Sequence, residues 1–88
     1  MSEISFARIL ACVRESQALS KAALARAAGI DPAVITRLEQ GLRPTPDVVQ
    51  TLNDVLGVDL TSQEVRAAVS ILSAGGIRVA RDMQVLNG

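Results

Sequence analysis

A chain of 88 residues favours a single domain, and a hydrophobic content of 49 % with one aromatic residue predicts an aliphatic core. Nine basic and nine acidic residues give no net charge, which argues against a nonspecific nucleic-acid coat. One cysteine and no histidine exclude an intrachain disulfide and argue against a zinc site. No apolar run is long enough to span a bilayer and no signal peptide is seen, so we expect a cytoplasmic protein without a membrane partner.

The first predicted helix runs from Ser5 to about Gln17. Ser5 is a suitable N-cap, because its hydroxyl can accept a bond from a free backbone N–H of the first turn. Cys12 is interpreted as a small core hydrophobe rather than a redox group. The apolar stripe of this helix consists of Phe6, Ile9, Leu10 and Val13, and it predicts that Phe6 lies in the core.

The second predicted helix begins at Ser20 and follows an alanine-rich run to Ala28. Gly29 is expected to end this helix, because glycine accepts the left-handed conformation that helix ends often need. Small residues at positions 25 and 28 allow a neighbouring helix to approach closely.

The third predicted helix follows after a short turn. Asp31 is its expected cap, Pro32 suits the first helical position, and Gly41 ends it after Glu39 or Gln40. The spacing points Val34, Ile35 and Leu38 inward and leaves Ala33, Thr36, Arg37 and Gln40 as an outer stripe. Two short helices crossing steeply, with one outer stripe, are typical of a helix-turn-helix unit whose second helix enters the DNA major groove.

Two further helices and a tail complete the chain. Thr45 caps an amphipathic helix that ends at Gly57, and Thr61 with Glu64 matches a capping box that starts the fifth helix. The tail from Ile77 to Leu86 fits both a strand and a helix, and we favour an extended segment that pairs with its twin across a dimer.

The run from Leu19 to Val58, LSKAALARAAGIDPAVITRLEQGLRPTPDVVQTLNDVLGV, resembles the Cro and phage-repressor (XRE) helix-turn-helix family. The matching features are L-S-x-x-x-L-A, A-x-x-A-G-I-D, I-T-R-L-E-x-G, R-P-T-P and the closing L-G-V. The resemblance implies an all-α, five-helix lambda-repressor-like fold. Residues 1–58 would form the DNA-binding core, and residues 59–88 the fifth helix and dimerisation tail of the same compact domain. It also implies an ion pair between Arg14 and Glu39 that ties the first helix to the third.

The predicted partner is double-stranded DNA, contacted through the third helix at residues 31–40. The outer stripe and the resemblance together assign this contact to Lys21, Pro32, Ala33, Thr36, Arg37, Gln40 and Arg43. Arg37 is the main candidate reader of bases, since a guanidinium group can bond guanine O6 and N7 together. Lys21 is similar in place to family residues that contact the DNA backbone or an outer base.

The other residues of this set have weaker roles. Thr36 is a candidate for a base or a phosphate, Gln40 for a phosphate, and Arg43 for phosphates. Pro32 and Ala33 depart from the polar readers often found there in the family, and they can touch only a thymine methyl group or nothing.

The apolar surplus after residue 60 predicts a homodimer, because one small domain reads only a few base pairs. Its interface is predicted to contain Val65, Val69, Leu72, Ile77, Val79, Met83 and Val85. The function expected is that of a repressor that binds an inverted-repeat operator and requires no cofactor, metal or small-molecule ligand.

Two alternatives compete with this function. The neutral charge and apolar tail also suit a helix-turn-helix scaffold that binds a protein partner, as an antirepressor or an antitoxin does, and one chain can combine both roles. An enzyme is disfavoured, because the sequence has no histidine, no activated nucleophile and no phosphate-binding loop.

Overall fold

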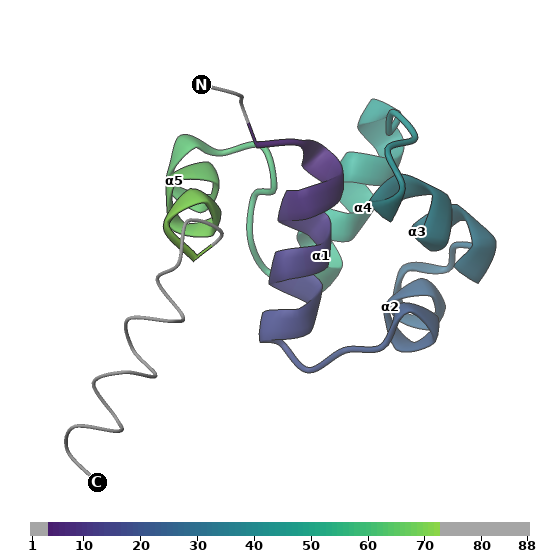
Figure 1. Ribbon diagram of the computed structural model, residues 1–88. Coiled ribbons are helices and arrows are strands. Elements are labelled where there is room, and N and C mark those ends of the chain that lie inside the picture. The colour runs from purple at the N-terminus through teal and green to yellow at the C-terminus, as the bar shows by residue number, and fades with distance from the viewer. Residues whose placement is uncertain (1–3, 73–88) are drawn as a thin grey trace, which may run out of the picture.

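The computed structural model describes residues 4–72, which form five α-helices and no strand (Figure 1). The helices are α1 Phe6–Ser16, α2 Lys21–Ala28, α3 Pro32–Glu39, α4 Pro46–Leu56 and α5 Gln63–Ile71. The predicted all-α, five-helix architecture is therefore confirmed. The tail residues predicted for the dimer interface, Ile77, Val79, Met83 and Val85, lie outside the described range.

Four of the five predicted helix starts are confirmed by the bonds that their caps make. Asp31 Oδ1 accepts a hydrogen bond from the backbone N–H of Ala33 at 2.8 Å. The hydroxyls of Ser5, Ser20 and Thr45 accept bonds from backbone N–H groups three residues on, at 3.2, 3.0 and 3.3 Å. Local side-chain chemistry thus fixes where α1 to α4 begin.

The predicted start of α5 is wrong by one residue. The cap is Ser62, whose hydroxyl accepts the Val65 N–H at 3.2 Å. Thr61 is instead bound by the carboxylate of Asp59, which accepts its backbone N–H at 3.0 Å and its hydroxyl at 2.7 Å. Because Asp59 occupies the Thr61 hydroxyl, the capping role passes to the next residue.

The ends of α2 and α3 share a hydrogen-bond pattern, and each has a glycine with a positive φ. Gly29 adopts φ 66°, and the next N–H, that of Ile30, bonds to the Ala25 carbonyl at 2.9 Å. Gly41 adopts φ 116°, and Leu42 N–H bonds to the Arg37 carbonyl at 2.9 Å. Both glycines therefore end their helices in the way that the sequence predicts.

The core is aliphatic, as the composition predicts. Its fully buried side chains come from α1 to α4 and from the segment before α5, and they are Ile9, Leu10, Leu24, Ile35, Leu38, Leu52 and Leu60. Phe6 packs against this core as predicted, but its side chain is only half-buried and lies at the edge of the core. Cys12 also packs at the edge of the core, as a small hydrophobe would.

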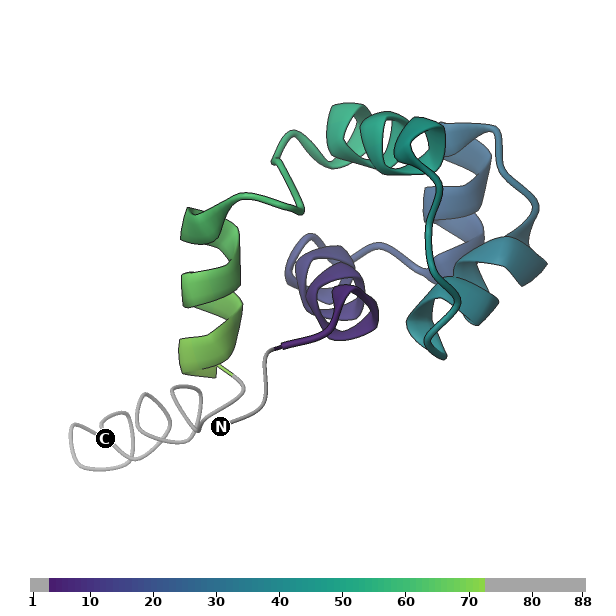
Figure 2. The same ribbon diagram turned by 90° about the horizontal axis from the view of Figure 1, so that it is seen from above.

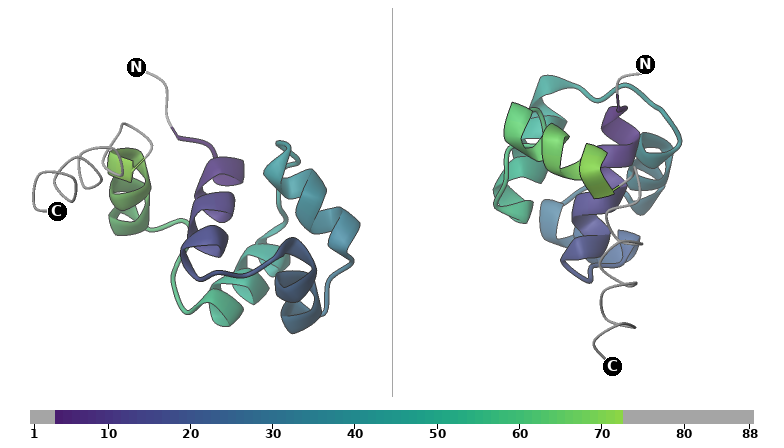
Figure 3. Two further views of the ribbon diagram at one scale, coloured as in Figure 1. Left: turned by 60° about the horizontal axis from the view of Figure 1, so that its bottom comes forward. Right: turned by 60° about the vertical axis from the view of Figure 1, so that its left-hand side comes forward.

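Helix α1 lies between α5 and the group formed by α2, α3 and α4 (Figures 1 and 2). It packs against α3 on one side and α5 on the other, while α2 packs against both α3 and α4. The left view of Figure 3 shows the same order from another direction. The helix-turn-helix pair α2–α3 and the fifth helix are therefore on opposite sides of α1.

Candidate nucleic-acid interface

The pair α2–α3 holds one face of α3 against the core. Ala25 of α2 is 1 % exposed, which shows the close approach that its small side chain permits. Ile35 and Leu38 are buried, and Val34 is half-buried against the same cluster. Since these three residues point inward as predicted, the opposite side of α3 faces outward.

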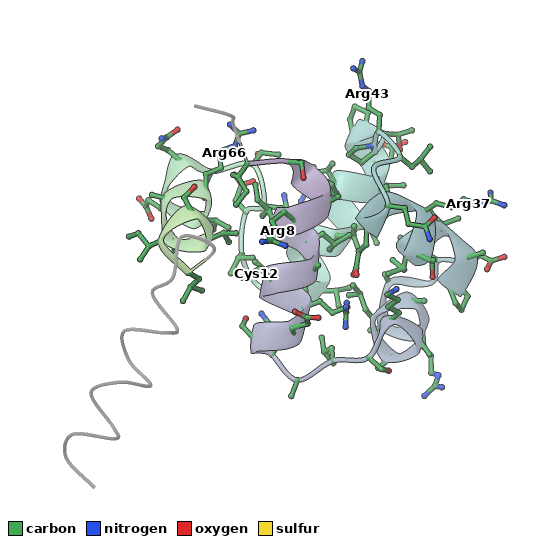
Figure 4. The ribbon with its side chains drawn as sticks, in the orientation of Figure 1. Arg8, Cys12, Arg37, Arg43 and Arg66 are labelled. Atoms are coloured by element: carbon green, nitrogen blue, oxygen red, sulfur yellow. The ribbon has the colours of Figure 1, made fainter. Side chains whose placement is uncertain are left out.

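The outer face of α3 contains the residues that the sequence assigns to DNA. Pro32, Ala33, Arg37 and Gln40 are exposed, whereas Thr36 is half-buried. Figure 4 shows Arg37 projecting away from the domain. Among residues 4–72, no side chain forms a hydrogen bond or ion pair with the Arg37 guanidinium, so its donors are available to an external partner.

Exposed cations also come before and after α3 along the chain. Lys21 is the first residue of α2, and Arg43 lies in the connection from α3 to α4, where it points away from the domain (Figure 4). The segment from residue 20 to 43 has two acidic residues, Asp31 and Glu39, against four basic ones. Both carboxylates are bound within the domain, one as the cap of α3 and the other to Arg14. The outward chemistry around α3 is therefore cationic although the whole chain is neutral.

Arg14 and Glu39, paired by the family resemblance, are in direct contact. Arg14 Nε donates to Glu39 Oε2 at 2.6 Å, and Nη2 donates to Oε1 at 3.0 Å. The third donor, Nη1, bonds to the Leu19 carbonyl oxygen at 2.8 Å. The two side chains are only 9 % and 7 % exposed, and the hydrogen bonds to Glu39 raise the pKa of Arg14 above its ordinary value. One guanidinium thus connects α1, the last turn of α3 and the segment that leads into α2.

Sequence patterns did not reveal two polar contacts that hold the helices of the domain together. Gln17 Nε2, just after α1, donates to the carbonyl oxygen of Leu56 at 2.7 Å. Asn53 Oδ1 accepts the backbone N–H of Leu60 at 2.8 Å, which fixes the chain between α4 and α5. Neither residue belongs to a local motif, because each bond depends on how separate segments meet.

The predicted dimer residues of α5 differ in how much surface they leave open. Val69 is 3 % exposed and Val65 is half-buried, since both pack on the core of their own domain. Leu72 is 39 % exposed, and Ile71, which the sequence did not single out, is 66 % exposed. Within α5 itself, large apolar side chains are therefore exposed only at the end of the helix.

Residues 4–72 contain neither a cluster of possible metal ligands nor a helix that could cross a membrane. No group of three or more His, Cys, Asp or Glu residues within residues 4–72 is placed to hold a metal ion. No helix in the same range has the length and hydropathy that crossing a bilayer demands.

Comparison with known proteins identifies the domain. The family model described as Helix-turn-helix (HTH_3) matches residues 13–63, which include α2, α3, α4 and the last turn of α1. No curated protein and no solved structure gave a significant match. The matched family is a DNA-binding domain and is typically non-enzymatic. The chain belongs to the Cro and phage-repressor (XRE) type of the helix-turn-helix family.

Proposed function

We propose that this chain is a sequence-specific transcriptional repressor that binds an inverted-repeat operator as a homodimer, with α3 in the major groove. The observation that carries the proposal is the exposed, unpaired guanidinium of Arg37 on the outer face of α3. An arginine in this position can bond guanine O6 and N7 at once, and this is the commonest specific contact in the major groove. The proposed repressor works in the cytoplasm on genomic DNA.

Three other residues position the helix on the duplex in this proposal. Lys21 and Arg43 are exposed, one before and one after α3 in the chain, and in this proposal they bind phosphates. Gln40 is exposed at the end of α3 and also reaches the backbone, whereas half-buried Thr36 has access to the groove only through its outer edge. Phosphate contacts set the register, and Arg37 adds the base contact.

The ion pair of Arg14 and Glu39 supports this function indirectly. It removes the only carboxylate in α3 from the outer face and fixes the last turn of that helix to α1. Because a free carboxylate beside Arg37 would repel phosphates, burying Glu39 keeps the face cationic.

The proposed dimer forms through the end of α5. Ile71 and Leu72 are the exposed large hydrophobic residues of this helix, and α5 lies on the side of α1 away from α3. Pairing there leaves both copies of α3 free to read half-sites about 34 Å apart. Burial of Leu60 and Val69 in the shared core supports the prediction that the segment after residue 58 belongs to the same compact domain.

Selection of bound duplexes from a library with a randomised centre tests the function. We expect an enriched site with two inverted half-sites and an affinity that falls steeply as salt rises, because phosphate contacts release counterions. Failure to enrich any sequence, even at low salt, would contradict the proposal.

A charge at the end of α5 tests the dimer. Ile71→Glu should convert the protein to a monomer in sedimentation equilibrium and weaken operator binding, since a carboxylate in an apolar interface lacks a partner. Gln63→Glu places the same charge at the opposite end of α5 and should change neither property. A wild-type protein that sediments as a monomer at all concentrations would exclude this dimer.

A second candidate is a protein-binding scaffold, as in an antirepressor or an antitoxin. Leu42 favours it, because this side chain is 49 % exposed directly after α3 and adds an apolar contact beside the helix. A stoichiometric protein partner lost on Leu42→Ser, with no duplex bound at low salt, would establish this function instead. A partner found together with operator binding would establish a dual role.

A further inference from the structure

We infer that the two ends of α3 read chemically different features of each operator half-site. Pro32 and Ala33, in the first turn, contact the methyl group of a thymine, whereas Arg37, one turn later, bonds a guanine. The inference rests on the proposed function and names the DNA sequence class that it selects.

The four residues of the first turn of α3, Pro32 to Ile35, have only carbon in their side chains. The carboxylate of Asp31 is used to cap the helix, with its Oδ1 2.8 Å from the Ala33 nitrogen. Val34 and Ile35 are turned toward the core. The exposed outer surface of this turn therefore consists of the Pro32 ring and the Ala33 methyl group.

Thymine is the base that matches such a surface. In the major groove it presents a C5-methyl group, which alanine and other apolar groups contact, while the other bases present mainly hydrogen-bonding groups. An apolar side chain pressed on a donor or acceptor would leave that group without its water and without a partner, which costs free energy. The first turn thus favours thymine by contact and disfavours the other bases by desolvation.

The spacing along α3 places the two readings close together. Ala33 and Arg37 are four residues apart on one face, which corresponds to about 6 Å along a helix axis. Base steps in B-DNA are about 3.4 Å, so the thymine and the guanine lie about two base pairs apart in the half-site. Gln40 continues the same stripe toward the phosphates, and it does not add a second guanine reading.

Modified bases in the selected duplex test the inference. Each thymine of the enriched half-site is replaced in turn by uracil, which differs only by the missing methyl group. At one thymine per half-site we expect an affinity loss of about fourfold, the effect of one buried methyl group. Replacing the guanine with 7-deazaguanine removes the N7 acceptor and should weaken binding about tenfold.

Matched glycine variants assign the methyl effect to the first turn of α3. In Ala33→Gly the affinity loss caused by uracil should be clearly smaller than in wild type, because the Ala33 methyl group is gone and only the Pro32 ring still contacts the base. Ala67→Gly, on an exposed position of α5, has a comparable cost in helix propensity and should keep the fourfold effect. Circular dichroism confirms that both variants fold.

The outcomes separate this inference from the proposed function. A selected operator that contains no thymine near the guanine, or whose uracil forms all bind like the original, overturns the inference and leaves the repressor proposal standing. A uracil effect of equal size in wild type and Ala33→Gly also overturns it. If no duplex is bound at all, both proposals fail.

Discussion

Ala18 has an unusual backbone conformation for its residue type. Its φ is 57°, the only positive φ of a non-glycine residue in the part of the chain that the structure describes. The position follows α1, and the next N–H, that of Leu19, bonds to the Arg14 carbonyl at 3.2 Å. This geometry matches the ends of α2 and α3, where glycine occupies the corresponding place. Alanine gave no sequence signal for it, so the strain became visible only in the structure.

Ala18→Gly should therefore stabilise the domain. A side chain in the left-handed region costs about 1 kcal/mol, and glycine removes that cost. The free energy of unfolding in urea should rise by about this amount. Ala27→Gly, within α2 and also exposed, should lower it by about 0.5–1 kcal/mol, because glycine weakens a regular helix. Destabilisation by both substitutions would show that Ala18 is not strained.

The ion pair of Arg14 with Glu39 is buried, unlike the contact of Arg14 with Glu15. The Glu39 side chain is 7 % exposed and accepts hydrogen bonds from two nitrogens of Arg14. The Glu15 side chain is 69 % exposed, and its Oε2 lies 3.6 Å from Arg14 Nη2. Spacing within the sequence does not pair residues 25 positions apart; the family resemblance supplied this pair. The contribution of this pair to the free energy of unfolding depends on its burial, which only the structure reveals.

Arg14→Ala should destabilise the domain by about 3–5 kcal/mol, because it leaves the Glu39 carboxylate buried without its partner. Glu15→Ala should cost less than about 1 kcal/mol, as exposed pairs do. The double variant Arg14→Met with Glu39→Met should recover much of the loss, since no buried charge remains. Urea denaturation measures all of these. Similar effects of Arg14→Ala and Glu15→Ala would contradict the role assigned to burial.

At the scale of elements, the local signals located the helices well and failed where two polar groups competed. The caps of α1 to α4 are short-range contacts that each sequence motif encodes. Before α5, however, the Thr61 hydroxyl donates a hydrogen bond to Asp59, and Ser62 caps the helix instead. These bonds from Thr61, with a smaller contribution from Asn53, lower the pKa of Asp59.

The lowered pKa of Asp59 predicts a pH dependence of stability. The folded state binds the proton of this group less readily than the unfolded chain does, so the carboxylate favours folding at neutral pH. This contribution begins to fall near the ordinary pKa of 3.8 and is lost as pH drops through the folded value. Unfolding free energies of wild type and Asp59→Asn, measured from neutral pH to below 3.8, should differ most at neutral pH and converge in acid. A constant difference would contradict the prediction.

At the scale of the whole molecule, the sequence predicted which face of α3 points outward but did not predict how α5 packs. The outward stripe follows from helical periodicity alone. The apolar residues of α5 cover more than one face of the helix. Periodicity alone therefore does not decide whether Val65 and Val69 contact α1 or a second subunit. The structure packs both on the core of their own chain and leaves Ile71 and Leu72 exposed. Long-range packing of this kind depends on the whole set of helices.

The whole arrangement explains how a neutral chain can bind DNA. The two acidic residues of segment 20–43 are used in internal bonds, Arg37 projects on the side away from α5, and Arg43 projects from the top of the same view (Figure 4). Arg66, in contrast, belongs to α5, beyond α1. The distribution of charged side chains over the surface, rather than the net charge of the chain, therefore decides where a polyanion binds.

The most direct test compares Arg37→Ala with Arg66→Ala in titrations of the selected duplex followed by fluorescence anisotropy. Both substitutions remove one positive charge, but only Arg37 lies on the outer face of α3. We predict that Arg37→Ala weakens binding about tenfold or more and relaxes the preference for guanine, while Arg66→Ala binds like wild type. Equal affinity of wild type and Arg37→Ala, with both proteins folded, would contradict the claim that α3 reads DNA through this residue.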